Sequence, residues 1–363
     1  MNIVVRADAS TFMGIGHVMR CLTLANALSE AGNNIHFVCR EHQGHLGEKI
    51  LAAGHALYLL PPPPTSIKTK PDPALSPPHQ QWLGVSWKTD AKQTKEAIGD
   101  LIVDWLIVDH YALDARWESL IRSVAKRILV IDDLADRKHD CDELLDQTIN
   151  QPETIYSGLV PNHCQLLVGS AYALLRSDFT TLRSKSLARR TEPSLKHLTI
   201  VFGGGDQSKH IIDALKSIQK SVIAKNVNIT VVMAEDSRHY NQVNALSEKL
   251  PFEIEVLSYV DDMAQLMFKT DLVIGAAGGA SLERCCLGVP TLLFLLAENQ
   301  QANAQALSDM GAVSIIKDLT VDLKETLNTF VEAPQRLIVF SKAASELVDG
   351  KGTQRVMQRF QGA

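Results

Sequence analysis

Short apolar runs alternate with amphipathic stretches along the whole chain, and this alternation restricts the fold more than any other feature of the sequence. The runs are rich in Val, Ile and Leu on both faces, as are parallel strands that helices cover on both sides. Repeated alternation of such strands with helices is typical of doubly wound α/β sheets. The predicted strands are Ile3–Arg6, Ile35–Cys39, Leu101–Asp109, Ile128–Asp132, Leu166–Val168, Leu198–Phe202, Ile229–Met233, Ile254–Leu257, Leu272–Gly275, Thr291–Leu295 and Val313–Ile316.

Chain length and one change of composition predict two domains. A chain of 363 residues is too long for one ordinary hydrophobic core. The stretch between Asp178 and Lys196 is polar and basic and contains a proline, so we place the domain boundary there. We therefore predict an α/β protein with two doubly wound, Rossmann-like domains that face a central cleft. They cover residues 1–180 and 190–363, and the last helix is free to pack back on the first domain.

Composition and charge exclude several classes of protein. The net charge of −5 argues against binding to nucleic acid or to a membrane surface, because both require basic patches. No apolar run reaches the roughly 18 residues of a membrane span, and no signal peptide precedes the first predicted strand. The six cysteines contain no C-x-x-C pair, which is typical of a reduced protein. We therefore expect a cytoplasmic enzyme without an integral membrane segment.

The first candidate site is a glycine turn that ends in a histidine. Gly14 and Gly16 follow the first strand and allow a tight turn with close approach of a ligand. His17 then begins a predicted helix at the carboxyl end of that strand, where open α/β sheets bind ligands. The helix N-terminus disfavours imidazolium, so we expect a neutral histidine that accepts a proton; capping or packing is the alternative. Asp8 and Arg20 flank His17, and either could orient it or contact substrate, although a surface salt bridge also explains Arg20.

Polar residues follow two other strands of the same half. Asp109-His110-Tyr111 and Asp132-Asp133 lie at strand carboxyl ends and should face the same crevice. Tyr111 is a candidate, with Asp8, for orienting His17 or a bound substrate. His139 and Cys141 follow at a spacing that fits no zinc or calcium pattern, so we predict no metal site. The proline-rich loop Pro61–His79 is either a flap near a site or a surface insertion.

The second candidate site is a pair of glycine-rich loops in the second half. The first loop, Gly203-Gly204-Gly205, can hold phosphate or a base through its N–H groups, or it is only a flexible turn. The second loop contains Gly278, Gly279 and Ser281 and suits a diphosphate.

Two polar groups near the second loop complete this candidate site. Glu283, one helix turn farther on, can accept hydrogen bonds from two ribose hydroxyls, or it only complements the helix dipole. Asn299 and Gln300 can bind sugar hydroxyls or acetamido groups, or they are the polar start of a helix.

These motifs carry a resemblance to known families. The second half resembles the nucleotide-sugar domain of GT-B glycosyltransferases, notably the bacterial N-acetylglucosaminyltransferase that makes lipid II. The matching pieces are the Gly203–Ser208 loop, the Ser281-x-Glu283 helix, Gly288-Val289-Pro290 and Gln300-Gln301. The whole chain resembles more narrowly the pseudaminic acid pathway hydrolases of UDP-2,4-diacetamido-2,4,6-trideoxy-β-L-altropyranose, which are GT-B relatives. The motifs shared with them are Arg6–Ser10, Gly14–Cys21, Asp109–Tyr111, Asp132–Arg137, Tyr172–Arg176 and Glu283–Gly288.

The resemblance implies a GT-B-like fold and a hydrolase that needs neither metal nor cofactor. The N-terminal domain would hold the sugar and the C-terminal domain the UDP. His17 would activate a water that attacks the anomeric carbon with inversion and releases free sugar and UDP. The resemblance also implies pseudaminic acid biosynthesis and flagellin glycosylation, with other enzymes of that sugar pathway as candidate partners.

Two other functions remain compatible with the residues. A GT-B glycosyltransferase would use the same donor site with a sugar or lipid acceptor. A non-catalytic protein on this scaffold would only bind a UDP-sugar. Fold alone does not decide between them.

Overall fold

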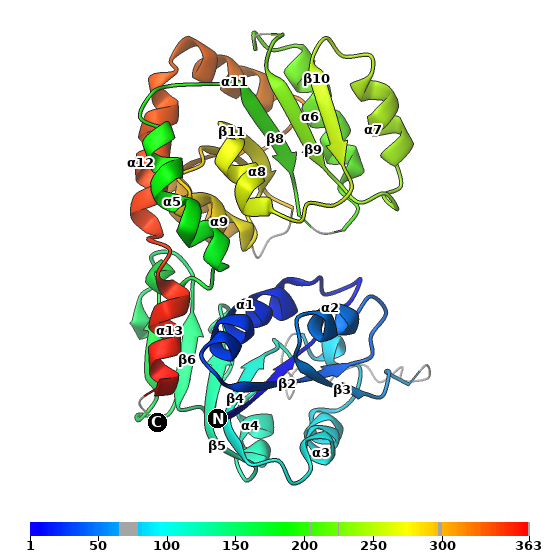
Figure 1. The fold of residues 1–363 in the computed structure, drawn as a ribbon, viewed down its shortest axis with the longest axis vertical. Coiled ribbons are helices and arrows are strands. Elements are labelled where there is room, and N and C mark those ends of the chain that lie inside the picture. The colour runs from blue at the N-terminus through cyan, green and yellow to red at the C-terminus, as the bar shows by residue number, and fades with distance from the viewer. Residues whose placement is uncertain (65–78, 204, 224, 297–299, 362–363) are drawn as a thin grey trace. The chain divides into compact units, whose positions relative to one another are not determined.

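The computed structural model describes residues 1–64, 79–203, 205–223, 225–296 and 300–361 (Figure 1). Internal contacts divide the chain into two compact units. Unit 1 comprises Met1–Leu174 and the C-terminal segment from Gly352, and unit 2 comprises Leu175–Lys351. The predicted boundary stretch is largely helix α5 (Ser177–Arg189), which belongs to unit 2.

Unit 1 is built on a seven-stranded parallel sheet with the strand order β3-β2-β1-β4-β5-β6-β7. Its strands are β1 (Asn2–Ala7), β2 (Asn34–Arg40), β3 (Ala56–Leu60), β4 (Val103–Asp109), β5 (Ala125–Ile131), β6 (Glu143–Asp146) and β7 (Gln165–Val168). Its α-helices are α1 (Gly16–Glu30), α2 (Gly47–Ala52), α3 (Trp87–Ile98), α4 (Ala115–Ile121) and α13 (Gly352–Gln361), and its 3₁₀ helices are η1 (Gln80–Leu83), η2 (Glu153–Tyr156) and η3 (Ser170–Tyr172).

Successive side chains of β1 enter different layers of unit 1, as expected for a strand buried on both faces. Val5 packs in one apolar cluster with Leu24 of α1 and with α13. Val4 packs in another cluster with Trp117 of α4 and with α3. This alternation decides which polar residues at the strand ends reach α1, where the first candidate site lies.

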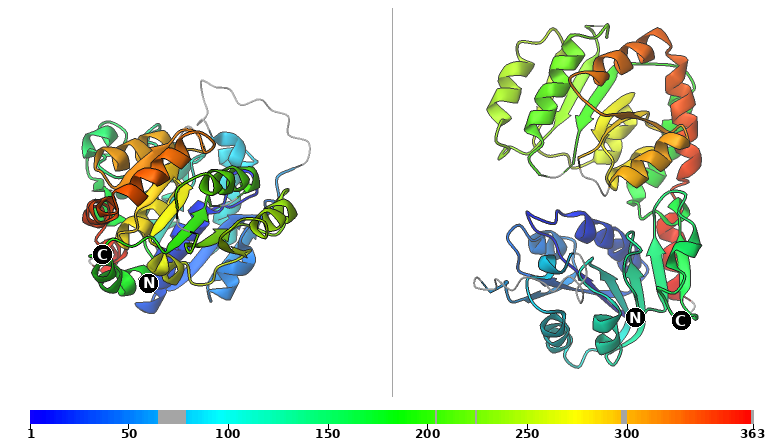
Figure 2. Two further views of the ribbon diagram at one scale, coloured as in Figure 1. Left: turned by 90° about the horizontal axis from the view of Figure 1, so that it is seen from above. Right: turned by 180° about the vertical axis from the view of Figure 1, so that it is seen from behind.

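Unit 2 has a six-stranded parallel sheet with the order β10-β9-β8-β11-β12-β13 (Figures 1 and 2). Its strands are β8 (His197–Val201), β9 (Asn228–Val232), β10 (Glu253–Leu257), β11 (Leu272–Ala276), β12 (Thr291–Phe294) and β13 (Val313–Ile316). Besides α5, its helices are α6 (Ser208–Gln219), α7 (Tyr240–Ser247), α8 (Met263–Lys269), α9 (Ala280–Cys286), α10 (Gln301–Asp309), α11 (Asp322–Glu332) and α12 (Gln335–Leu347).

Helix α5 fixes α9 by donating to its last carbonyls. Arg183 donates to the Cys286 carbonyl, and Ser186 Oγ donates to the Leu287 carbonyl at 2.7 Å. Arg190 Nε, just after α5, also donates to Leu287 at 3.1 Å. These donors satisfy carbonyls that have no partner inside α9, and the two guanidinium groups complement the negative end of its dipole.

The doubly wound α/β prediction is confirmed, and every predicted strand is present within a few residues. The sequence interpretation missed β3 and β6. Strand β6 has only four residues and begins and ends with an acid, so it carries no apolar run of its own. Among the described residues, no helix is both long and apolar enough to cross a membrane.

Candidate functional site

Both sheets reverse their strand order at the loops that carry the predicted site residues. In unit 1 the reversal lies between β1 and β4, whose carboxyl ends lead to His17 and Asp109. In unit 2 it lies between β8 and β11, which lead to the loops at Gly203 and Gly278. Ligands of open α/β sheets bind in the crevice at such switch points. Topology alone therefore marks one candidate site in each unit.

The glycine turn before α1 presents His17 at the first turn of the helix. Ser10 and Gly14 close the turn with two backbone hydrogen bonds, of 3.2 and 2.9 Å. Gly14 has a φ of +81°, a backbone conformation that residues other than glycine rarely adopt. A Cβ at Gly14 or at Gly16 would meet no atom within 4 Å. The backbone at both positions is therefore not covered by other described parts of unit 1.

Asp109, the last residue of β4, is the hydrogen-bond partner of His17. The distance from His17 Nδ1 to Asp109 Oδ1 is 2.6 Å, and Asp109 is completely buried. Burial by itself raises the pKa of Asp109, but Arg20 and His17 outweigh it and hold that pKa well below its usual range. An ionised Asp109 accepts a hydrogen bond from Nδ1–H of His17 and so favours the tautomer in which the Nε2 lone pair is free to take a proton.

Arg20 lies one turn after His17 and holds Asp109 with two hydrogen bonds. Its Nε donates to Oδ2 at 2.6 Å and its Nη2 to Oδ1 at 2.7 Å. Its Nη1 donates to Asp133 Oδ2 at 2.9 Å. The predicted substrate contact of Arg20 therefore has a competing explanation, because its guanidinium already bridges two carboxylates.

Tyr111 contacts His17 through its ring. The two ring centroids are 4.5 Å apart and the planes stand at 87°. The Tyr111 hydroxyl donates to Asp133 Oδ1 at 2.5 Å. Burial and then the charge of Asp133 raise the pKa of Tyr111, so the phenol stays protonated. The structure thus brings Tyr111 to His17, as one of the predicted arrangements required.

Two aromatic rings near His17 and Tyr111 were not identified from the sequence. Trp82 of η1 lies 6.1 Å from His17 and 5.6 Å from Tyr111 between ring centroids. The His79 ring lies 4.6 Å from Trp82 and 5.3 Å from Tyr111. Burial lowers the pKa of His79, which favours its neutral form. His79 ends the proline-rich Pro61–His79 loop, of which residues 65–78 lie outside the described part of the chain.

The contacts of Asp8 in the structure are with residues other than His17, whereas the sequence interpretation offered Asp8 for orienting His17 or the sugar. Its Oδ1 lies 2.6 Å from Arg6 Nη1 and also accepts from the Arg40 backbone N–H at 2.7 Å. The reason is strand alternation: Val4, Arg6 and Asp8 share one side of the strand, whereas α1 covers the other. Asp109 is paired in register with Ala7, and its side chain therefore lies on the side of the sheet that α1 covers.

The parity of β4 was the signal that could have identified Asp109. Trp105 and Ile107 of β4 pack in the same cluster as α1. Asp109, two residues beyond Ile107, therefore points toward α1. The sequence interpretation grouped Asp109 with its neighbours at the strand end without using this alternation.

In unit 2 the first glycine loop is anchored by an acid. Gly203 and Gly205 have φ values of +88° and +83°; Gly204 lies outside the described residues. Asp206 Oδ1 accepts from the Ser208 hydroxyl at 2.6 Å, and its Oδ2 accepts from the Arg238 backbone N–H at 3.2 Å. These contacts hold the loop to the start of α6 and to the segment before α7.

The second glycine loop is anchored by a buried arginine. Arg284 Nη2 donates to the Ala276 carbonyl at 2.7 Å and to Ser281 Oγ at 2.9 Å, so it joins the two ends of the loop. Burial lowers the pKa of Arg284 to about 10. A Cβ at Gly278 or Gly279 would meet no atom within 4 Å. The Arg284 side chain therefore fixes the two ends of the loop, and the backbone at Gly278 and Gly279 is left uncovered by the described residues.

Glu283 and Gln300 already have partners inside unit 2. Glu283 Oε1 lies 3.7 Å from Arg176 Nη2. Burial raises the pKa of Glu283, and Arg176 and Arg284 oppose that effect. Gln300 Oε1 accepts from the Leu296 N–H at 3.1 Å. Asn299, the last predicted residue of this group, lies outside the described part of the chain.

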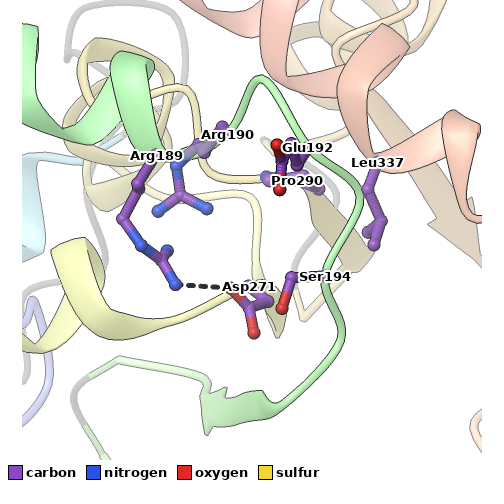
Figure 3. A pocket seen from close by; sticks show the side chains of 7 residues that line it. All are labelled: Arg189, Arg190, Glu192, Ser194, Asp271, Pro290 and Leu337. Carbon is purple, nitrogen blue, oxygen red and sulfur yellow. Dashed lines mark hydrogen bonds and ion pairs between the residues drawn. The ribbon is translucent and has the colours of Figure 1, made fainter.

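A small pocket of unit 2 lies at the opposite edge of the sheet (Figure 3). Its lining includes Asp271 and Pro290, which precede β11 and β12, and it is therefore at the amino ends of these strands. Arg189 Nη2 lies 2.7 Å from Asp271 Oδ1 (Figure 3). Arg190 donates to the main-chain carbonyls of Leu287 and Met267. Because these groups are already paired, we interpret the pocket as part of the packing between α5 and the sheet and not as a ligand site.

The comparisons with known proteins agree with this architecture. Residues 198–359 match the model of the glycosyltransferase family 28 C-terminal domain. MurG of Acinetobacter baumannii superposes with a TM-score of 0.70 at 16% identity, over 100% of this chain and 99% of that one. The fold is that of the GT-B glycosyltransferases. A UDP-GlcNAc 2-epimerase from Neisseria meningitidis, solved with UDP-GlcNAc, also superposes, with a TM-score of 0.63 at 11% identity over the full length of both chains.

Relatives in sequence are distant. A UDP-2,4-diacetamido-2,4,6-trideoxy-beta-L-altropyranose hydrolase of Campylobacter jejuni is 23% identical over 86% of this chain and 97% of its own length. The spore coat polysaccharide biosynthesis protein SpsG of Bacillus subtilis is 28% identical over 54% of this chain. An uncharacterized protein of Methanocaldococcus jannaschii is 24% identical over 83% of this chain. The present chain spans 58% and 57% of the lengths of these last two proteins.

Proposed function

We propose that this protein is an enzyme that hydrolyses a UDP-linked 2,4-diacetamido-2,4,6-trideoxyhexose to the free sugar and UDP. The observation that carries the proposal is the 2.6 Å contact between His17 Nδ1 and Asp109 Oδ1 at the switch point of unit 1. An ionised, buried carboxylate on Nδ1 makes Nε2 a general base. The likeness to the Campylobacter jejuni hydrolase, which extends over nearly all of that enzyme, supports the choice of substrate.

In the proposed reaction, Nε2 of His17 takes a proton from water as the water oxygen attacks the anomeric carbon. The bond between that carbon and the diphosphate oxygen breaks, and UDP leaves with the electron pair. A single displacement inverts the anomeric configuration. Asp109 stabilises the imidazolium that forms, as the acid of a catalytic triad does. General-base catalysis of this kind contributes about 10²–10⁴-fold.

The nucleotide would bind to the glycine loops of unit 2. Backbone N–H groups around Gly203, Gly205, Gly278 and Gly279 would hold the diphosphate, and Glu283 would accept from the ribose hydroxyls. Gln300, with Asn299, would contact the sugar. The reaction then requires the anomeric carbon of this donor to reach His17. We propose no metal, which an assay in EDTA tests directly: loss of turnover that Mg²⁺ or Mn²⁺ restores would contradict it.

A glycosyltransferase is the second candidate, favoured by the family 28 match over residues 198–359. Purified protein incubated with UDP-sugars and no acceptor separates the two. The hydrolase releases UDP under these conditions, most rapidly from the diacetamido-trideoxy sugar. A transferase releases UDP only after a sugar or lipid acceptor is added, and a protein that only binds UDP-sugars releases none in either case. The proposed hydrolase would serve pseudaminic acid biosynthesis in the cytoplasm, and the first result would support its part in that pathway.

A further inference from the structure

One carboxylate, that of Asp133, contacts two side chains next to His17: Arg20, which binds Asp109, and Tyr111, whose ring packs on the imidazole. Asp133 lies just after β5, the neighbour of β4 in the sheet. Its Oδ2 accepts from Arg20 Nη1 at 2.9 Å, and its Oδ1 accepts from the Tyr111 hydroxyl at 2.5 Å. No contact between Asp133 and His17 itself is needed for this arrangement.

The two partners of Asp133 act on different sides of the imidazole. Arg20 grips Asp109, and Asp109 holds the Nδ1 edge of His17. Tyr111 stands at 87° to the imidazole plane with its centroid 4.5 Å away. The first contact sets which ring nitrogen carries the proton, and the second restricts rotation of the ring. Both depend on side chains that Asp133 anchors.

We propose that Asp133 is the positioning residue of the His17 base, acting through Arg20 and Tyr111 on the tautomer and the orientation of the imidazole. The proposal rests on the proposed function for its kinetic consequence. Its structural consequence, the state of the His17 ring, does not depend on turnover. Small displacements of a catalytic group cost on the order of 10²-fold in rate, so a residue that only positions the base has a measurable effect.

Asp133 also balances charge beside the base. Arg20 carries one positive charge between two carboxylates, Asp109 and Asp133. Removal of the Asp133 charge leaves Arg20 with Asp109 as its one remaining carboxylate partner among the described residues. Asp133 therefore helps to hold the guanidinium in the place from which it binds Asp109.

Asp140 offers a matched control in the same unit. Like Asp133 it accepts from an arginine and from a hydroxyl: Arg122 Nη2 at 3.2 Å and Ser119 Oγ at 2.8 Å. The two carboxylates are similarly exposed, at 28% for Asp140 and 25% for Asp133. Asp140 has no part in the proposed site, so Asp140→Asn reports the general cost of losing such a pair.

The test compares Asp133→Asn, Asp140→Asn and Tyr111→Phe with the wild type. Steady-state UDP release gives kcat, calorimetry gives UDP affinity, and ¹⁵N-histidine NMR without substrate gives the His17 tautomer. Asp133→Asn should lower kcat about 10- to 100-fold and leave UDP affinity unchanged. It should also replace the single His17 tautomer by a mixture. Asp140→Asn should leave all of these as in the wild type.

Tyr111→Phe removes only the hydroxyl that donates a hydrogen bond to Asp133, and it keeps the aromatic ring. It should change the His17 resonances and lower kcat by less than Asp133→Asn does. If Asp133→Asn does not fold, Tyr111→Phe tests the positioning role of Asp133 in its place. Wild-type His17 resonances in the folded variants would overturn the proposal, as would an equal loss of kcat in Asp140→Asn. If the wild type releases no UDP from any UDP-sugar, the proposed function fails while the NMR comparison still decides the role of Asp133.

Discussion

His17 Nδ1 lies 2.6 Å from Asp109 Oδ1, although 92 positions separate the two residues in the chain. They meet because β1 and β4 are neighbours in the sheet and both run toward the same edge. His17 begins α1 just after β1, and Asp109 ends β4 on the side that α1 covers. The contact therefore follows from the fold and needs no special loop conformation beyond the turn at Gly14.

Replacing Asp109 by Asn should remove most of the activity without unfolding the site. Asn has the same shape, but its amide can donate to Nδ1 and so favour the tautomer with the proton on Nε2, which is no base. We expect kcat for UDP release to fall about 10²–10⁴-fold while UDP affinity by calorimetry stays unchanged. Asp104, on the same strand and 2.7 Å from Lys126, provides the control Asp104→Asn, which should keep wild-type kcat. Wild-type kcat in Asp109→Asn would remove the carboxylate from the mechanism.

Replacing Glu283 by Ala should weaken UDP binding by about 1–3 kcal/mol, because ribose hydroxyls lose their acceptor. The half-buried position of Glu283 beside Arg176, in the helix that follows the second glycine loop, motivates this expectation. Calorimetry with UDP measures it, and Glu325→Ala, at an exposed acid of α11, is the control. An affinity that Glu283→Ala leaves intact would assign the nucleotide to other residues.

Two glycines of unit 2 should respond in opposite ways to alanine. Gly288 has a φ of +62°, and a Cβ there would lie 2.6 Å from Leu187 Cδ2. We expect Gly288→Ala to destabilise unit 2 by at least about 1–2 kcal/mol. At Gly278 a Cβ would meet no atom within 4 Å, so Gly278→Ala should fold normally and bind UDP less tightly. Thermal unfolding and UDP titration distinguish them; normal UDP binding by a stable Gly278→Ala would show that no ligand approaches this loop closely.

Of all parts of the fold, the strands were predicted best from the sequence. Parallel strands buried on both faces need apolar side chains at every position, so runs such as Leu272–Gly275 are visible without an alignment. Strand β6 escaped because it has four residues and an acid at each end. Its acid Glu143 is paired with Arg359 of α13 at 3.1 Å, a contact that local sequence does not reveal.

Individual site residues were harder to predict than the loops that carry them. The glycine turn marks His17 because its spacing is local. The partner of His17 depends on strand neighbours and parity, so the structure pairs His17 with Asp109, which was missed, and not with Asp8, which is nearer in sequence. Trp82 reaches His17, and His79 packs against Trp82 and Tyr111, from a segment with no motif, so only the folded chain brings them there.

Hydrolysis of the UDP-sugar in ¹⁸O-water tests the central claim most directly. If water activated by His17 attacks the anomeric carbon, the released sugar carries the label and UDP carries none. The sugar first formed should have the inverted anomeric configuration. His17→Ala should bind UDP as the wild type does and release neither product. Label in the phosphate of UDP would show attack at phosphorus and would contradict the account, as would near wild-type turnover in His17→Ala.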